Sequence, residues 1–181
     1  MENIKIKSNL KYLGIPILLV LYFIIKYSKY NMFILLLHLI LIVYGYLTTV
    51  SDLETKTIPN KLMIIMSVTW LSMMAPLIIF DTKTAISLLK ESFLGFATGG
   101  GMLLMVYLLS KKGLGGGDVK FMALTGLYIG PGGVYAAMLI GSILAGLTVL
   151  SLICIKKLGR KDTIPLAPFL YAGILTTVFL M

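Results

Sequence analysis

Long apolar runs separated by short basic clusters are the feature that most constrains how this chain can fold. Of its 181 residues, 59% are hydrophobic and only 13% are charged. A soluble domain has about 45–50% apolar and about 25% charged residues, whereas a membrane-spanning helix needs about 20 mostly apolar residues. We therefore predict an all-α, polytopic membrane protein in which residues 1–181 form a single membrane-embedded domain.

Seven apolar segments can be placed along the chain. We expect spans at about residues 12–25, 32–50, 62–80, 92–109, 119–130, 134–155 and 163–181. The first is flanked by basic residues as in a signal peptide, but no small-residue cleavage site follows it, so we expect it to be retained. A turn at Pro131-Gly132-Gly133 separates the fifth and sixth segments. Glycines in the fourth segment predict a close-packed helix face: Gly95, Gly99, Gly100 and Gly101.

The distribution of basic residues tests this count. With seven spans and a cytoplasmic N-terminus, twelve Lys and Arg residues fall on the inside and four on the outside. Cytoplasmic loops carry such an excess of basic residues. Merging the fifth and sixth segments would give six spans and an even distribution of eight against eight. We therefore predict about seven spans, with the segments around Asp52 and Asp118 both on the cytoplasmic side.

Composition also argues against several classes of partner. The net charge of +9 comes from short clusters between apolar runs rather than from one basic face, so we expect contact with membrane lipid and no binding of nucleic acid. The single cysteine, Cys154, excludes an internal disulfide and a cysteine-based zinc site. One histidine, His38, is too little for a metal site. We expect no metal and no cofactor.

Two carboxylates stand at the boundaries of apolar segments. Asp52 follows the second segment, and Asp118 directly follows Gly115-Gly116-Gly117. Ionisable groups at membrane depth are costly and suggest function. The structural alternatives are a helix N-cap for Asp118 and a solvated loop position for Asp52. The glycines remove side chains and permit unusual backbone angles, which suits a loop beside an extended substrate, so Gly115 and Gly117 are candidate substrate contacts.

Two carboxylates brought together cannot easily both ionise, and such a pair can hold a water between them. The ionised member can take a proton from that water while the neutral member polarises a peptide carbonyl. Asp52 and Asp118 therefore predict hydrolysis that needs neither a metal nor a covalent intermediate. The pair titrates as a unit, so neither acid is assigned as the base.

Two sequence patterns carry a resemblance to a known family. Asp52-Leu-Glu-x-x-x-Ile-Pro59-Asn-x-Leu62 and Gly115-x-Gly117-Asp118-x-Lys120 resemble the two aspartate motifs of type IV prepilin peptidases, the Gly-x-Gly-Asp class of intramembrane aspartyl proteases. Ile164-Pro165-x-x-Pro168-Phe169 is similar to a third segment of that family. The similarity extends from about residue 44 to the C-terminus, with the aspartate motifs in the family's order.

The resemblance implies that Asp52 and Asp118 are the catalytic dyad of an aspartic-type endopeptidase in the cytoplasmic membrane. It implies prepilin or pseudopilin substrates, each with a short basic leader cut on the cytoplasmic side of a hydrophobic helix, and hence a role in type IV pilus assembly or protein secretion. Larger family members carry an N-terminal cysteine-rich loop and also methylate the new N-terminus. The region before Asp52 lacks cysteine, so we expect a compact form without methyltransferase activity.

Two further polar residues are candidates for substrate binding. Lys120 can pair with a charge on the substrate or with lipid phosphate, or can serve only as a positive-inside anchor. Glu54 can meet a basic leader, or can be a solvated loop residue. The rival function is a small transporter or channel subunit in which the acids form an ion or proton site, since helices broken by glycine also build ion sites. The position of the acids at one face, rather than at mid-bilayer, favours the peptidase.

Overall fold

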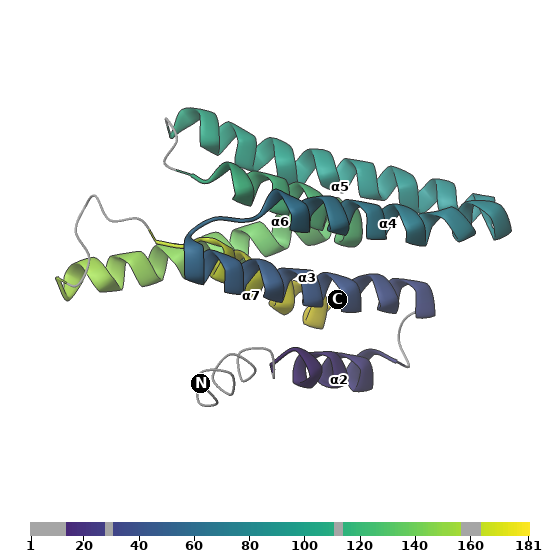
Figure 1. Ribbon diagram of the computed structural model, residues 1–181, viewed down its shortest axis with the longest axis horizontal. Coiled ribbons are helices and arrows are strands. Elements are labelled where there is room, and N and C mark those ends of the chain that lie inside the picture. The colour runs from purple at the N-terminus through teal and green to yellow at the C-terminus, as the bar shows by residue number, and fades with distance from the viewer. Residues whose placement is uncertain (1–13, 28–30, 111–113, 157–163) are drawn as a thin grey trace, which may run out of the picture.

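The computed structural model describes residues 14–27, 31–110, 114–156 and 164–181, and every regular element within these ranges is a helix. The helices lie side by side in a bundle (Figure 1). They are α2 (Gly14–Lys26), α3 (Met32–Thr55), α4 (Asn60–Phe80), α5 (Thr82–Leu109), α6 (Gly116–Cys154) and α7 (Ala167–Leu180). The prediction of an all-α fold is confirmed.

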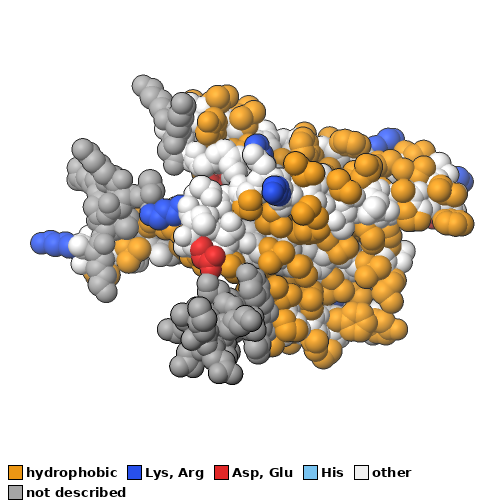
Figure 2. Space-filling view, viewed as in Figure 1, with side chains coloured by type: hydrophobic (Ala, Val, Ile, Leu, Met, Phe, Trp, Pro, Cys, Tyr) orange, Lys and Arg blue, Asp and Glu red, His pale blue; other side chains and the backbone are white. Residues whose placement is uncertain are grey.

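Helix length and composition support the membrane assignment. α3, α4, α5 and α6 are each long and apolar enough to cross a membrane, whereas α2 and α7 are apolar but have only 13 and 14 residues. Hydrophobic side chains cover much of the visible surface of the described residues (Figure 2). On α4, for example, Ile64, Val68 and Leu71 are about 60% exposed. Such a broad apolar face is unusual for a soluble protein and is suited to lipid.

The longest helix, α6, doubles back on itself and so contains both the fifth and the sixth predicted segments. Gly130 adopts φ 67° and ψ −178°, a conformation that glycine reaches without steric cost. A Cβ added to Gly99 would lie 2.3 Å from the Met122 carbonyl oxygen and 2.8 Å from Val134 Cγ2. Residues twelve apart are about 18 Å apart along a straight helix, so the chain reverses between them. The turn predicted at Pro131 therefore begins at Gly130.

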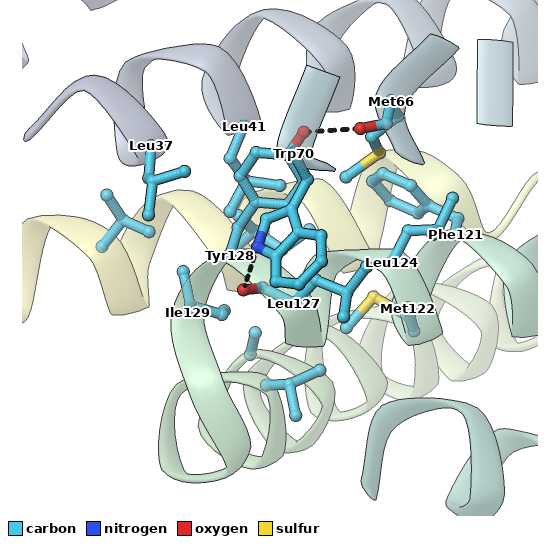
Figure 3. Packing of buried hydrophobic residues seen from close by; sticks show 14 of the residues in the cluster. Leu37, Leu41, Met66, Trp70, Phe121, Met122, Leu124, Leu127, Tyr128 and Ile129 are labelled. Atoms are coloured by element: carbon cyan, nitrogen blue, oxygen red, sulfur yellow. Dashed lines mark hydrogen bonds between the residues drawn. The ribbon is translucent and has the colours of Figure 1, made fainter. Parts of the chain in front are cut away.

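The reversal is held by hydrogen bonds to the carbonyl of Leu127. Pro131 has no N–H, so it cannot donate to the carbonyl four residues earlier. Trp70 Nε1 and Ser92 Oγ donate to this oxygen instead, at 3.0 and 2.7 Å. Figure 3 shows the Trp70 indole reaching Leu127. An unpaired carbonyl costs several kcal/mol in a bilayer, so these donors stabilise the bend and join it to α4 and α5.

Glycines bring α5 and α6 into backbone contact. A Cβ on Gly95 would lie 2.1 Å from the Gly126 carbonyl oxygen, and one on Gly100 would lie 2.9 Å from Ala123 Cβ. Together with the contact at Gly99, these distances confirm the predicted packing role for three of the four glycines of this segment. The prediction is wrong for Gly101, where an added Cβ would meet no atom within 4 Å in the described part of the chain.

Two helices extend further than predicted. α3 continues to Thr55, so Asp52 lies on a helix, and α5 begins at Thr82, so residues 82–91 are helical rather than a connection. Asp81 caps α5 by accepting hydrogen bonds from Thr84 N at 3.2 Å and Thr84 Oγ1 at 2.6 Å. Such a cap lets a helix start among polar residues, which a count of apolar residues cannot reveal.

The ends of the helices sort into two groups. The C-terminal ends of α3 and α5 and the N-terminal ends of α4, α6 and α7 lie at the same end of the bundle (Figure 1), as does the C-terminal end of α6.

Several residues used in the basic-residue count lie outside the described residues: Lys5, Lys7, Lys11, Lys29, Lys111, Lys112, Lys157, Arg160 and Lys161.

Candidate functional site

Two buried acids lie at this end of the bundle. Asp52 is in the last turn of α3 and Asp118 in the first turn of α6, and their side chains are 6% and 8% exposed. The solvated-loop alternative for Asp52 is therefore wrong. The helices that carry the two residues, α3 and α6, contact each other. The fold thus brings together two acids that are 66 positions apart in the sequence.

Asp52 is held by a contact with α7. Its Oδ2 accepts a hydrogen bond from the backbone N–H of Ala167 at 3.0 Å. Ala167 is the first residue of α7, and the N-terminal end of a helix carries a partial positive charge that attracts carboxylates. After Asp52 the helix ends at Lys56, which has φ 52° and donates its N–H to the Asp52 carbonyl at 2.8 Å. The Ala167 contact fixes one carboxylate oxygen of Asp52, and the Lys56 contact ends the helix just after it.

Asp118 is the third residue of α6, and the N-cap of that helix is Gly115. The N-cap alternative for Asp118 is therefore wrong. Its Oδ2 lies 2.7 Å from the position that a Cβ on Gly115 would take. Its Oδ1 is buried and has no hydrogen-bond partner among the described residues. Because an unpaired buried polar atom costs about 1–3 kcal/mol, this oxygen suits a site that bonds substrate or water.

The start of α4, which follows the helix that carries Asp52, contacts the first turns of α6, which carry Asp118. Lys120 Nζ donates to Asn60 Oδ1 at 2.9 Å, which joins α6 to the start of α4. A Cβ on Gly117 would lie 3.0 Å from Ile58 Cβ. Gly117 therefore lets the segment before α4 approach the first turn of α6.

The remaining candidates from the sequence have distinct positions. Gly115 is exposed and faces the carboxylate of Asp118, whereas Gly117 is half-buried against Ile58. Glu54 is exposed in the last turn of α3, on the same turn as Asp52. In the described part of the chain, no three His, Cys, Asp or Glu side chains gather at one point.

Sequence reasoning missed two polar partners of the site. Asn60 contacts Lys120 through its side chain, and Asn60 belongs to the first aspartate motif, so its place in that motif was an available signal. The donor to Asp52 is a backbone N–H of Ala167, which no residue type reveals. Only the proline pattern around it, at Pro165 and Pro168, marked this segment.

Comparison with known proteins identifies the family of this chain. The family model for the type IV leader peptidase family matches residues 35–150. The matched region includes both Asp52 and Asp118 and ends before α7, which supplies the contact to Asp52. No curated protein and no solved structure matches the chain. The match covers more than half of the sequence, and the chain therefore belongs to the type IV leader peptidase family, whose members are peptidases.

Proposed function

We propose that this protein is an aspartic-type endopeptidase of the cytoplasmic membrane that removes the short basic leader from prepilin or pseudopilin precursors. The observation that carries the proposal is the pair of buried acids, Asp52 and Asp118, in which Asp118 Oδ1 has no partner among the described residues. Family membership supports the peptidase activity and a prepilin-type substrate.

The proposed mechanism uses the two acids as one proton-sharing pair. A water held between Asp52 and Asp118 loses a proton to the ionised carboxylate and attacks the scissile carbonyl. The protonated carboxyl donates a hydrogen bond to that carbonyl oxygen and stabilises the developing oxyanion. Collapse of the tetrahedral intermediate then breaks the C–N bond, and a proton returns to the leaving amine. The Ala167 N–H keeps the Asp52 carboxylate oriented throughout.

The polar surroundings suit a basic leader at the cytoplasmic face. Glu54 is exposed one half-turn beyond Asp52 and can attract the basic residues of the leader. Lys120 lies two residues after Asp118 and can contact lipid phosphate or a substrate carboxylate. Methyltransferase activity is not part of the proposal.

The decisive experiment replaces each acid by its amide. Asp52→Asn and Asp118→Asn should each reduce leader removal from a co-expressed prepilin at least 100-fold, because an amide cannot share the proton. Asp81→Asn is the matched control, since Asp81 caps α5 and is no part of the acid pair. Processing at the wild-type rate in either dyad variant would overturn the assignment. Loss of ion flux in Asp118→Asn proteoliposomes, with no peptide cut by the wild type, would instead favour a transporter.

A further inference from the structure

A lateral groove runs along the membrane-embedded part of the protein beside the acid pair. It has a volume of about 820 Å³ and lies between α4, α5 and the first arm of α6, residues 116–129. In Figure 1, α4 and α5 run side by side on the same face of the bundle. Val119 and Lys120 line the groove and directly follow Asp118. Neither acid lines the groove, which therefore begins one residue after Asp118 on α6.

One side of the groove is made of small residues. Ala97, Gly100 and Gly101 of α5 and Ala123 of α6 line it. Gly95, Gly99 and Gly100 are required for packing of α5 on α6, but a Cβ on Gly101 would meet no atom within 4 Å. Packing within the described residues therefore does not explain Gly101. Small residues let a second helix approach closely in a membrane, so this side of the groove is shaped to receive one.

The other side of the groove is apolar, and polar groups gather at one end of it. Ile64 and Met63 of α4, with Phe96 and Leu104 of α5, provide large apolar side chains. Polar groups gather at the end near Asp118, where Lys120 Nζ and Asn60 Oδ1 form their hydrogen bond. An occupant of matching chemistry is apolar along most of its length and polar at the end beside the acids.

The length of the groove fits about two turns of helix. Its lining positions on α4 run from Asn60 to Ser67, and those on α5 run from Phe96 to Leu104. At 1.5 Å per residue these stretches extend over about 10–12 Å. A precursor cut at the membrane face must place its apolar helix in the bilayer directly after the scissile bond, within reach of the same acids.

We infer that this groove binds the apolar helix of the precursor, with the first two turns after the cleaved bond packed against Gly101 and Ile64. The inference rests on the proposed function and extends it, because it assigns substrate recognition to a surface that is separate from Asp52 and Asp118. Contact with Lys120 and Asn60 at the polar end fixes the position of the precursor helix along the groove. This position determines which peptide bond reaches the acid pair.

A substitution that fills part of the groove with a side chain tests whether the precursor helix binds there. Two cleavage rates are compared: the rate on a full-length prepilin and the rate on a leader peptide that ends soon after the scissile bond. In Gly101→Leu the ratio of the first rate to the second should fall at least tenfold below the wild-type ratio. Gly146→Leu is the matched control, because Gly146 also has open space around it but lies on the second arm of α6, outside the groove. This control should keep the wild-type ratio of the two rates.

Photo-cross-linking provides a second measurement that does not depend on turnover. A photoreactive residue at position 64, in an Asp118→Asn background that retains the precursor, should cross-link to the apolar helix of a co-expressed prepilin. The same residue at position 65 should not, because Ile65 is exposed but does not line the groove.

The outcomes separate the inference from the proposed function. Wild-type protein that cuts neither substrate would contradict the proposed function itself. The groove assignment alone would be overturned by a different set of results. In that case the wild-type protein cuts both substrates, Gly101→Leu keeps the wild-type rate ratio, and positions 64 and 65 cross-link equally. Lipid would then be the occupant of the groove.

Discussion

The backbone N–H of Ala167 donates a hydrogen bond to Asp52 Oδ2 at 3.0 Å, across 115 positions of chain. This contact makes α7 part of the site although α7 lies outside the region that the family model matches. α7 is itself held in place, since Tyr171 Oη donates to the Ile42 carbonyl at 3.0 Å. A Cβ on Gly173 would lie 2.1 Å from the Ala137 carbonyl oxygen. α7 therefore positions Asp52, a candidate catalytic residue on α3.

Asp52→Asn and Asp52→Ala should differ in stability although both remove the proposed activity. Asparagine retains an oxygen that can accept from the Ala167 N–H, whereas alanine does not. Loss of a hydrogen bond to a charged group costs about 1.5–3 kcal/mol, so Asp52→Ala should unfold at a clearly lower temperature than Asp52→Asn in detergent. Equal melting temperatures for the two variants would show that the contact with α7 contributes nothing to stability.

Trp70 and Ser92 should be energetically coupled through the Leu127 carbonyl. Either donor alone can satisfy this oxygen, but Trp70→Phe together with Ser92→Ala leaves it unpaired next to the bend of α6. Groups that share a partner show interaction energies of about 0.5–3 kcal/mol, so the double variant should lose more stability than the sum of the single variants. Denaturant unfolding in micelles provides the measurement.

Ser151→Ala is the control for this cycle. Its hydroxyl donates only to the Leu147 carbonyl within its own helix, at 2.7 Å. Combined with Trp70→Phe it should be additive. Additivity for Ser92 as well would contradict the shared-acceptor interpretation.

Gly95→Ala should be among the most damaging single-methyl changes in the protein. The added Cβ would lie 2.1 Å from the Gly126 carbonyl oxygen and 2.8 Å from the Gly130 carbonyl carbon. Both are backbone atoms that cannot move aside, and overpacking of this kind costs about 1–3 kcal/mol or more. The fraction of monodisperse protein after detergent extraction should fall sharply. Gly146→Ala, which adds the same methyl in open space, should match the wild type.

The sequence predicted the parts of the fold that depend on apolar length and on helix-breaking residues. Seven spans were predicted, and four helices in the described part of the chain are long and apolar enough to cross a membrane. The reversal near Pro131 and the placement of Asp52 and Asp118 at one end also follow from these patterns, because a bilayer leaves few alternatives to a helix. Helix ends were less well predicted. α5 starts ten residues early because Asp81 caps it, and hydropathy does not register a cap.

The sequence predicted the two acids of the candidate site but not the groups that surround them. Carboxylates at span boundaries stand out in an apolar chain, but Asp81 stands at one too. The prediction that Asp52 and Asp118 form a pair therefore also used the glycines before Asp118 and the resemblance of the two motifs. The Ala167 N–H could not, because a backbone donor has no residue signature and its position depends on how α7 packs. The groove beside Gly101 is likewise a property of three helices together, and the glycine pattern of α5 alone predicted packing there instead.

Gly115 and Gly116 give the sharpest test of the glycine-rich segment, because neighbouring glycines have different surroundings. A Cβ on Gly115 would lie 2.7 Å from Asp118 Oδ2, whereas one on Gly116 would meet no atom of the described residues within 4 Å. Gly115 has φ −73° and ψ 132°, which alanine adopts readily. Gly115→Ala should therefore fold normally but displace the Asp118 carboxylate, and a misplacement of about 1 Å can cost about 100-fold in rate.

The measurement is kcat for prepilin cleavage, with melting temperature as the check on folding. Gly116→Ala should retain both kcat and melting temperature, because its methyl enters open space. A normal kcat in Gly115→Ala would contradict a role for Gly115 in placing the acid. A low kcat in both variants would mean that the whole glycine segment must stay free of side chains, as expected if an extended substrate passes over it.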